Sequence, residues 1–129
     1  MKKATILIVE DDDATADLIR LILTRSGYAV TGVVASGEKA IDTAVRTKPD
    51  LVLMDIKLNG KIDGIMAFEQ IKKVVNVPVV FVSAYMDKEM IARAKRCEPN
   101  GYIAKPFKKE VLLSMVGSIL DWQRTNSEE

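Results

Sequence analysis

The sequence of 129 residues contains no histidine and only one cysteine, Cys97. Without histidine, the chain cannot supply a Ser-His-Asp or Cys-His catalytic group, a histidine metal ligand or a phosphohistidine of its own. A single cysteine excludes both an internal disulfide and a CxxC metal site. Disulfide-free chains are typical of reducing compartments, so we expect the protein in the cytoplasm.

Long hydrophobic runs and an excess of charge of one sign are also missing. The apolar run after the N-terminal lysines covers only residues 4–9, too short for a signal peptide or a membrane span. The net charge of +1 gives no general attraction to nucleic acid or membranes, so neither is an expected partner. A composition of 48% hydrophobic and 29% charged residues is typical of a globular domain.

Short apolar runs alternate with amphipathic segments along the chain. We expect strands over residues 5–9, 28–34, 50–55, 79–82 and 101–104. We expect helices over residues 13–26, 36–48, 64–75, 87–97 and 108–124. This alternation predicts an α/β fold of the doubly wound type, with a parallel sheet, right-handed crossovers and helices on both faces. It predicts one domain over residues 1–124 and a frayed tail over 125–129.

Helical spacing of apolar residues indicates which sides of the first two helices face the sheet. The expected inward residues are Leu18, Ile19, Ile22, Leu23, Ala40, Ile41, Ala44 and Val45. The fourth helix has a thin apolar face and a basic surface that includes Lys88, Arg93, Lys95 and Arg96. We therefore expect that helix to be loosely held, with its basic residues in solvent.

Polar side chains follow four of the five expected strands. They are Glu10 with Asp11 after the first strand, Asp55 after the third, Ser83 after the fourth and Lys105 after the fifth. Each has an ordinary structural explanation alone, such as a turn, a helix N-terminus or a solvated lysine. Because ligands bind beyond the carboxyl ends of parallel strands, the four together predict a functional site at that edge.

The residue types indicate phosphoryl chemistry assisted by a metal ion. Converging carboxylates of Glu10, Asp11 and Asp55 would repel one another unless a cation joins them, and such hard oxygen ligands suit Mg²⁺. The Ser83 hydroxyl can donate to a phosphoryl oxygen, and Lys105 can act as a point charge for a phosphoryl group or a carboxylate. Pro106 follows Lys105 directly, and a cis bond there would determine where the lysine points.

These residues and their order resemble the receiver domain of two-component response regulators. The resemblance rests on Ile-Leu-Ile-Val-Glu-Asp-Asp at 6–12, Asp-Leu-Val-Leu-Met-Asp at 50–55, Asp-Gly at 63–64, Val-Ser-Ala at 82–84 and Gly-Tyr-Ile-Ala-Lys-Pro-Phe at 101–107. It implies a flavodoxin-like (βα)5 fold with the strand order 2-1-3-4-5. It also implies that Asp55 accepts a phosphoryl group from a sensor histidine kinase or a phosphotransfer protein.

The resemblance also implies roles for the other site residues. Mg²⁺, or Mn²⁺, would bind Glu10, Asp11, Asp55 and the backbone carbonyl of Lys57. Ser83 and Lys105 would follow the phosphoryl charge, and Tyr102 would act with Ser83 as a switch, although it also fits a half-buried strand aromatic. The domain would then assist its own phosphorylation and dephosphorylation.

The implied output surface consists of the fourth helix, fifth strand and fifth helix. It would control an unidentified downstream protein, and it allows a homodimer. The loop 58–64 departs from the family pattern because it lacks proline and is one residue longer. Lys57 and Tyr85 occupy the positions that tune the phosphoryl lifetime in this family.

Two alternatives from other functional classes remain open at this point. A flavodoxin-like enzyme or nucleotide-binding protein would need a glycine-rich phosphate loop after the first strand, where this chain has acids instead. A degenerate receiver would bind a partner without phosphorylation. Retention of all five polar site residues, Glu10, Asp11, Asp55, Ser83 and Lys105, argues against it.

Overall fold

The computed structural model describes residues 3–84 and 87–127. Its strands are β1 (Thr5–Val9), β2 (Ala29–Val34), β3 (Leu51–Met54), β4 (Val79–Ser83) and β5 (Gly101–Ala104). Its helices are α1 (Asp13–Arg25), α2 (Gly37–Thr47), α3 (Gly64–Val74), α4 (Lys88–Arg96) and α5 (Lys109–Ser127). The predicted alternation of strand and helix is confirmed.

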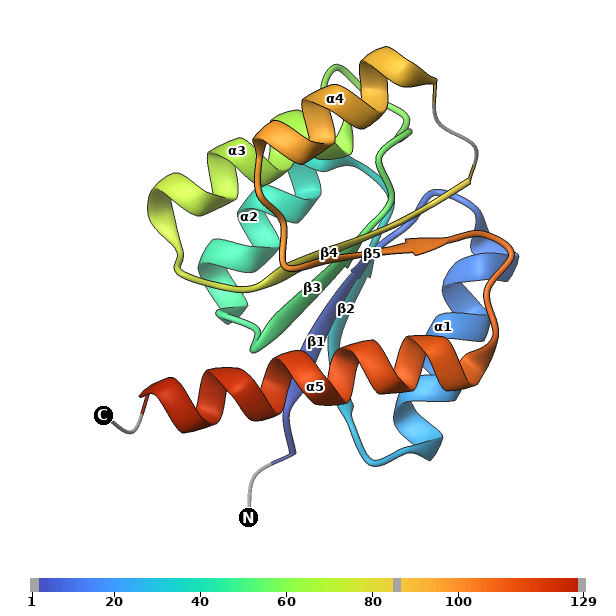
Figure 1. The fold of residues 1–129 in the computed structure, drawn as a ribbon, viewed down its shortest axis with the longest axis vertical. Helices are drawn as coiled ribbons and strands as arrows, with labels where there is room; N and C mark the ends of the chain where they lie inside the picture. Colours follow the sequence, from blue (N-terminus) through green and yellow to red (C-terminus); the bar gives the residue numbers. More distant parts are fainter. Residues whose placement is uncertain (1–2, 85–86, 128–129) are drawn as a thin grey trace.

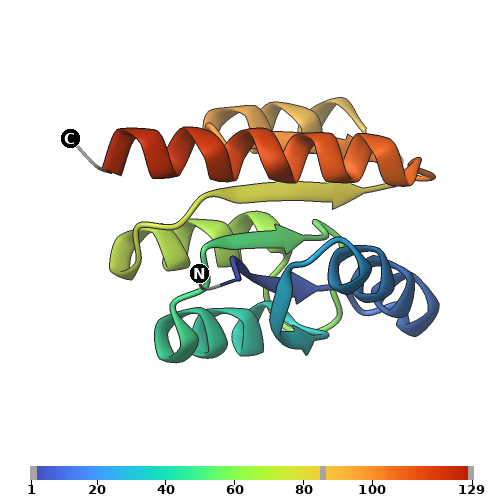
Figure 2. The same ribbon diagram turned by 90° about the horizontal axis from the view of Figure 1, so that it is seen from below.

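The five strands form one parallel sheet in the order β2-β1-β3-β4-β5, as the family resemblance implied. β3 lies in the middle and pairs with β1 on one side and with β4 on the other, while β2 and β5 are the edge strands. Figure 2 shows the strands running in one direction through the molecule. Their carboxyl ends therefore meet at a single edge.

Alternate residues of each strand face opposite sides of the sheet, and both sides are covered by helices. Leu7 and Val9 of β1 pack in a cluster with residues of α2 and α3, whereas Ile6 and Ile8 pack in a second cluster with residues of α1 and α5. The same division is visible in Figure 1, where α1 and α5 cover one face and α2, α3 and α4 the other. A strand buried on both faces has to be apolar at every position, which is why β1 and β3 are continuous hydrophobic runs.

Helices α1 to α4 each begin at a residue whose side chain accepts a hydrogen bond from a backbone N–H of the first turn. These caps are Asp12, Ser36, Asp63 and Asp87. Each satisfies a donor that the helix itself leaves without a partner, and such a cap is typically worth about 1 kcal/mol. The caps therefore determine the residue at which each of these helices begins after the preceding strand or loop.

Two residues expected to face the sheet are exposed instead. Leu18 is 49% exposed and Val45 is 43% exposed. The buried stripe of α1 runs through Ala16, Ile19 and Leu23, so Leu18 points about 100° away from Ile19. In α2 the buried face includes the polar residue Thr43, whereas the predicted member Val45 lies outside it.

The last helix is longer than predicted. α5 continues to Ser127 rather than ending at Arg124, while 128–129 lie outside the described residues, and the frayed tail stays a prediction. The Asn126 side chain donates a hydrogen bond to the carbonyl oxygen of Trp122 at 2.8 Å, which satisfies a carbonyl near the helix end. Of the helices within the described ranges, none combines the length and the apolar character that crossing a bilayer requires.

Candidate functional site

The predicted site residues gather at the carboxyl edge of the sheet, on either side of the boundary between β1 and β3. The connection after β1 leads outward to β2, and the chain then crosses over to β3, so this boundary is the point where the strand order reverses, which is where open parallel sheets bind ligands. The backbone ladder continues into the site. Asp55 N–H donates to the carbonyl of Val9 at 2.9 Å, and Lys105 N–H donates to the carbonyl of Ser83 at 2.8 Å.

Asp55 is buried, with 7% of the residue exposed, and both of its carboxylate oxygens have partners. The Ser83 hydroxyl donates to Oδ1 at 3.0 Å. The Lys105 ammonium donates to Oδ2 at 2.9 Å. Three strand ends that are distant in sequence therefore converge on one carboxylate.

Lys105 also donates a hydrogen bond to Glu10 Oε1, so its ammonium lies between two carboxylates. The other Glu10 oxygen accepts the N–H of Asp12 at 3.2 Å. The Lys105–Pro106 peptide bond is cis. The sequence identified Lys105 as a point charge for a phosphoryl group or a carboxylate, but it did not indicate that Glu10 and Asp55 would be the carboxylates.

The pKa values of Glu10 and Lys105 are both raised, but for different reasons. Burial raises the pKa of Glu10, and the nearby charge of Asp55 adds to the rise, whereas the hydrogen bonds from Lys105 and Asp12 oppose it. For Lys105, burial favours a lower pKa, but the hydrogen bonds and charges of Glu10 and Asp55 outweigh burial and raise it. The lysine is therefore held in its charged form at neutral pH.

Glu10, Asp11 and Asp55 form an acidic cluster in which one ligand oxygen from each residue lies within 4.8 Å of the others. Three carboxylates against one ammonium leave an excess of negative charge, which a divalent cation would compensate. Carboxylate oxygens are also the ligands that Mg²⁺ prefers. The residues present thus fit the predicted metal, whereas the ligand role of the Lys57 carbonyl stays a prediction.

The backbone of Asp55 is approached closely by Gly64 at the start of α3. A Cβ atom at Gly64 would lie 2.1 Å from the Asp55 carbonyl oxygen, and Gly64 N–H donates to the carbonyl of Ile56 at 2.7 Å. Only glycine allows this contact. The Asp-Gly pair at 63–64, which the sequence marked only as part of a motif, thus closes the loop after β3 and begins α3.

Tyr102, the predicted switch aromatic, lies on β5 and is 36% exposed. Its ring lies 5.8 Å from that of Phe81, centroid to centroid. Burial raises the pKa of the Tyr102 hydroxyl, with a further contribution from Cys97. Tyr102 is therefore partly buried against the sheet, and its movement with Ser83 stays a prediction. Tyr85, expected to tune the phosphoryl lifetime, lies outside the described residues.

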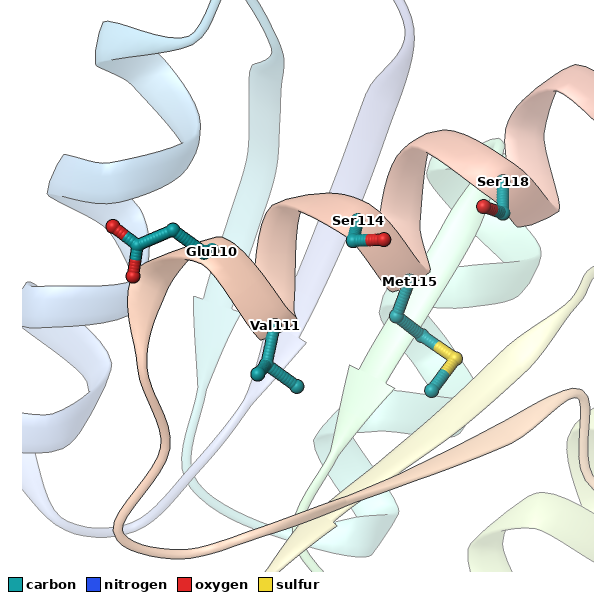
Figure 3. A pocket seen from close by; sticks show the side chains of 5 residues that line it. All are labelled: Glu110, Val111, Ser114, Met115 and Ser118. Carbon is teal, nitrogen blue, oxygen red and sulfur yellow. The ribbon is translucent and has the colours of Figure 1, made fainter.

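A surface hollow of about 440 Å³ lies along α5. Figure 3 shows its lining side chains, Glu110, Val111, Ser114, Met115 and Ser118, all on that helix. None of them is a predicted site residue. The hollow belongs to the face formed with β5, where Met115 packs against Gly101, so it is separate from the carboxylate cluster.

Two polar contacts around the site were missed by reasoning from the sequence. Glu38 accepts hydrogen bonds from the loop after β3, and Arg93 of α4 forms an ion pair with Asp63. The only sequence signal for Glu38 was an acid in the first turn of a helix, which the helix dipole explains equally well. Arg93 was expected in solvent, and this prediction is wrong because Asp63, the cap of the neighbouring helix, lies within reach of its guanidinium group.

Comparison with known proteins yields consistent matches. The family model for the response regulator receiver domain matches residues 6–117. The chain is 31% identical to the transcriptional regulatory protein CseB of Streptomyces coelicolor over 115 residues, which are 89% of this chain and 48% of that protein. It is 32% identical to the transcriptional regulatory protein PdtaR of Mycobacterium tuberculosis over 102 residues, 79% of this chain and 49% of that protein. The chain spans about half the length of the curated relatives it matches.

Solved structures agree with the family match. The signal receiver domain of a modulated diguanylate cyclase from Desulfovibrio desulfuricans has a TM-score of 0.91 at 34% identity, covering 97% of this chain and 99% of that one. A CheY-like receiver domain protein from Methanospirillum hungatei has a TM-score of 0.90 at 28% identity, again covering 97% and 99%. The similarity therefore extends over nearly the whole chain.

Proposed function

The chain belongs to the family of response regulator receiver domains of two-component signalling, and on that premise we propose that Asp55 is its phosphoacceptor. The observation that carries the proposal is the convergence of Ser83 and Lys105 on the two oxygens of the buried Asp55 carboxylate. A carboxylate held in this way has one donor and one cation already aligned with the oxygens that would flank an incoming phosphoryl group.

In the proposed reaction, an oxygen of Asp55 attacks the phosphorus of a phosphohistidine on a partner protein. A phosphorus–oxygen bond forms, the phosphorus–nitrogen bond breaks, and the departing imidazole keeps the electron pair and takes a proton. These 129 residues contain no histidine, so the phosphohistidine of the proposed reaction lies outside them, on a histidine kinase or a phosphotransfer protein. Its own residues orient the acceptor and balance the charge.

Lys105 and Ser83 would transfer their hydrogen bonds from the Asp55 oxygens to the phosphoryl oxygens. An aspartyl phosphate carries almost two negative charges, more than the carboxylate it replaces. The Lys105 ammonium, which lies 2.9 Å from Asp55 Oδ2, can move toward that charge without leaving the site. The Ser83 hydroxyl, 3.0 Å from Oδ1, can do the same.

Glu10, Asp11, Asp55 and the Lys57 carbonyl would hold Mg²⁺ or Mn²⁺. When bound, such a cation neutralises charge that develops on the phosphoryl oxygens. Support for the site comes from the 4.8 Å cluster of carboxylates and its excess negative charge. Lys105 donates hydrogen bonds to Glu10 and Asp55, two members of that cluster. The cation would therefore bind carboxylate oxygens that the lysine leaves free.

The proposed output is a change in the surface formed by α4, β5 and α5. Ser83 ends β4, and moving its hydroxyl toward a phosphoryl group would alter the packing beside Tyr102 on the neighbouring strand. A local change of charge would then bias a surface that has two arrangements. CseB and PdtaR are named as transcriptional regulators, and we assign the output here to a protein partner that reads this surface.

The test is the intact mass of the protein after incubation with acetyl phosphate, with and without Mg²⁺. We expect the wild type to gain one phosphoryl group only when Mg²⁺ is present, and Asp55→Ala to gain none. Asp42→Ala serves as a control because it removes an exposed carboxylate from α2. Circular dichroism should show that Asp55→Ala remains folded. A wild type that takes up no phosphoryl group would instead favour binding of a partner without phosphorylation.

A further inference from the structure

The loop between Asp55 and α3 is held in its middle by one side chain of α2. Glu38 Oε1 accepts hydrogen bonds from the backbone N–H groups of Lys61, at 3.2 Å, and Ile62, at 3.1 Å. Glu38 lies 23 and 24 residues before these partners, so the contact is tertiary rather than local. One carboxylate oxygen thus satisfies two consecutive loop donors, which is a strong arrangement because the acceptor is charged.

The loop backbone is shaped to fit this carboxylate. Gly60 has φ +110°, and a Cβ atom there would lie 2.7 Å from Glu38 Oε2. A residue with a side chain would therefore be strained in conformation, and the carboxylate would have to shift away from its present position. Beside it, the Ile62 side chain packs over Gly37, where a Cβ atom would lie 2.7 Å from Ile62 Cγ1. Ser36 and Asn59 add a parallel β-bridge.

The two ends of the loop are fixed independently of Glu38. At the first end, Asp55 continues the ladder with Val9. At the second, Gly64 donates to Ile56, and Asp63 caps α3 by accepting the N–H of Met66 at 2.8 Å. The segment between them carries Lys57, whose carbonyl is the predicted fourth metal ligand. It has no proline to stiffen it, so its conformation depends on contacts from outside the loop.

We propose that Glu38 is a positioning residue that holds the loop 57–63 in the conformation required for metal binding beside Asp55. This inference rests on the proposed function for the identity of the metal site. Glu38 touches no reacting group; it acts on the site only through the loop backbone. Without the Glu38 carboxylate, the loop would sample conformations in which the Lys57 carbonyl points away from the metal site. Binding Mg²⁺ would then have to order the loop, and the free energy of that ordering would lower the Mg²⁺ affinity.

The test is an amide NMR titration with MgCl₂ on the wild type, Glu38→Ala, Glu38→Gln and Asp42→Ala. Groups that orient metal ligands typically change metal affinity by about 10-fold to 100-fold, and we expect Glu38→Ala to raise the Mg²⁺ dissociation constant about tenfold. Glu38→Gln keeps one carbonyl oxygen that can accept both loop N–H groups, so it should bind Mg²⁺ as the wild type does. Asp42→Ala, on the same helix, should also match the wild type.

Amide exchange provides a readout that does not involve the metal. In Glu38→Ala the amides of Lys61 and Ile62 should exchange faster than in the wild type, and in Glu38→Gln they should not. Because Glu38 is exposed, its replacement leaves no cavity, and the variants are expected to fold. Comparing glutamine with alanine also removes the effect of the α2 dipole, since both variants lack the charge.

Equal Mg²⁺ affinity in Glu38→Ala and the wild type would overturn the inference. So would a Glu38→Gln variant as weak as Glu38→Ala, because a role based on charge alone would then replace the hydrogen-bond role. The titration is independent of phosphoryl uptake. A wild type that binds Mg²⁺ but is never phosphorylated would therefore overturn the proposed function, while the alanine and glutamine variants still decide the role of Glu38.

Discussion

Arg93 of α4 forms an ion pair with Asp63, the cap of α3, with 3.0 Å between Nη1 and Oδ2. The other oxygen of the same carboxylate caps α3. Among the nine residues of α4, all of which the structure describes, only Ala94 is fully buried. The pair therefore joins a weakly packed helix directly to the end of the loop that follows Asp55.

Removing this ion pair should have a small effect on the free energy of unfolding of the whole protein but a clear effect on local opening of α4. The side chains of Arg93 and Asp63 are 32% and 25% exposed, so Arg93→Ala should lower the free energy of unfolding by only about 0.5 kcal/mol. Amide hydrogen exchange within α4 should nevertheless become faster, because the helix has few other anchors. Lys95→Ala, an exposed basic residue of the same helix, is the control; equal exchange in both variants would contradict the role of the pair.

Two glycine substitutions should change stability in opposite directions. Gly64→Ala forces a Cβ atom to within 2.1 Å of the Asp55 carbonyl oxygen, and we expect a loss of about 2 kcal/mol or more in the free energy of unfolding. Gly117→Ala, inside α5, meets only Tyr28 Oη at 3.7 Å and should add about 0.5–1 kcal/mol because alanine favours helix. Urea unfolding measures both values, and a stable Gly64→Ala would show that the loop can move away from Asp55.

Removal of Lys105 should leave two carboxylates of the site without their cation. The Lys105 side chain is only 17% exposed, and we expect Lys105→Ala to lower the free energy of unfolding by about 2 kcal/mol in metal-free buffer. Added Mg²⁺ should restore part of the loss, since it binds the same carboxylates. Some phosphoryl uptake should remain, with a weaker surface response. Lys109→Ala, exposed at the start of α5, should show neither effect.

The raised pKa of Glu10 predicts a specific pH dependence of stability in metal-free protein. Burial raises the Glu10 pKa above 4.5 in the folded state, so the folded state holds this proton more tightly than the unfolded chain does. The resulting stabilisation is complete below pH 4.5 and is lost as the pH rises through the folded-state pKa. The wild type should therefore lose stability relative to Glu10→Gln over that interval.

Urea unfolding of both proteins at a series of pH values, in buffer containing a chelator, measures the difference. Glu10→Gln keeps the size of the side chain and an oxygen for Lys105, so the comparison isolates the titration of one carboxyl group. A difference that does not vary with pH, or that varies in the opposite sense, would show that the Lys105 hydrogen bond outweighs burial at Glu10.

The sequence alone determined the local structure and the candidate site residues. β1 and β3 are continuous apolar runs because both of their faces are buried, and the caps Asp12, Ser36, Asp63 and Asp87 start their helices through contacts within one turn. The acids, serine and lysine at the strand ends could be identified because parallel strands place their ends together. The errors at Leu18 and Val45 arose where several apolar residues competed for one helix face.

Only the tertiary structure decided which of these groups make contact. Lys105 and Glu10 are 95 residues apart, and their hydrogen bond exists because β1, β3, β4 and β5 bring their ends to one edge. The contacts of Glu38 with the loop and of Arg93 with Asp63 likewise depend on how neighbouring helices pack. The contacts of Glu38 and Arg93 join exposed or half-exposed polar residues, whose positions no hydrophobic periodicity constrains, so the sequence carries no pattern that would reveal them.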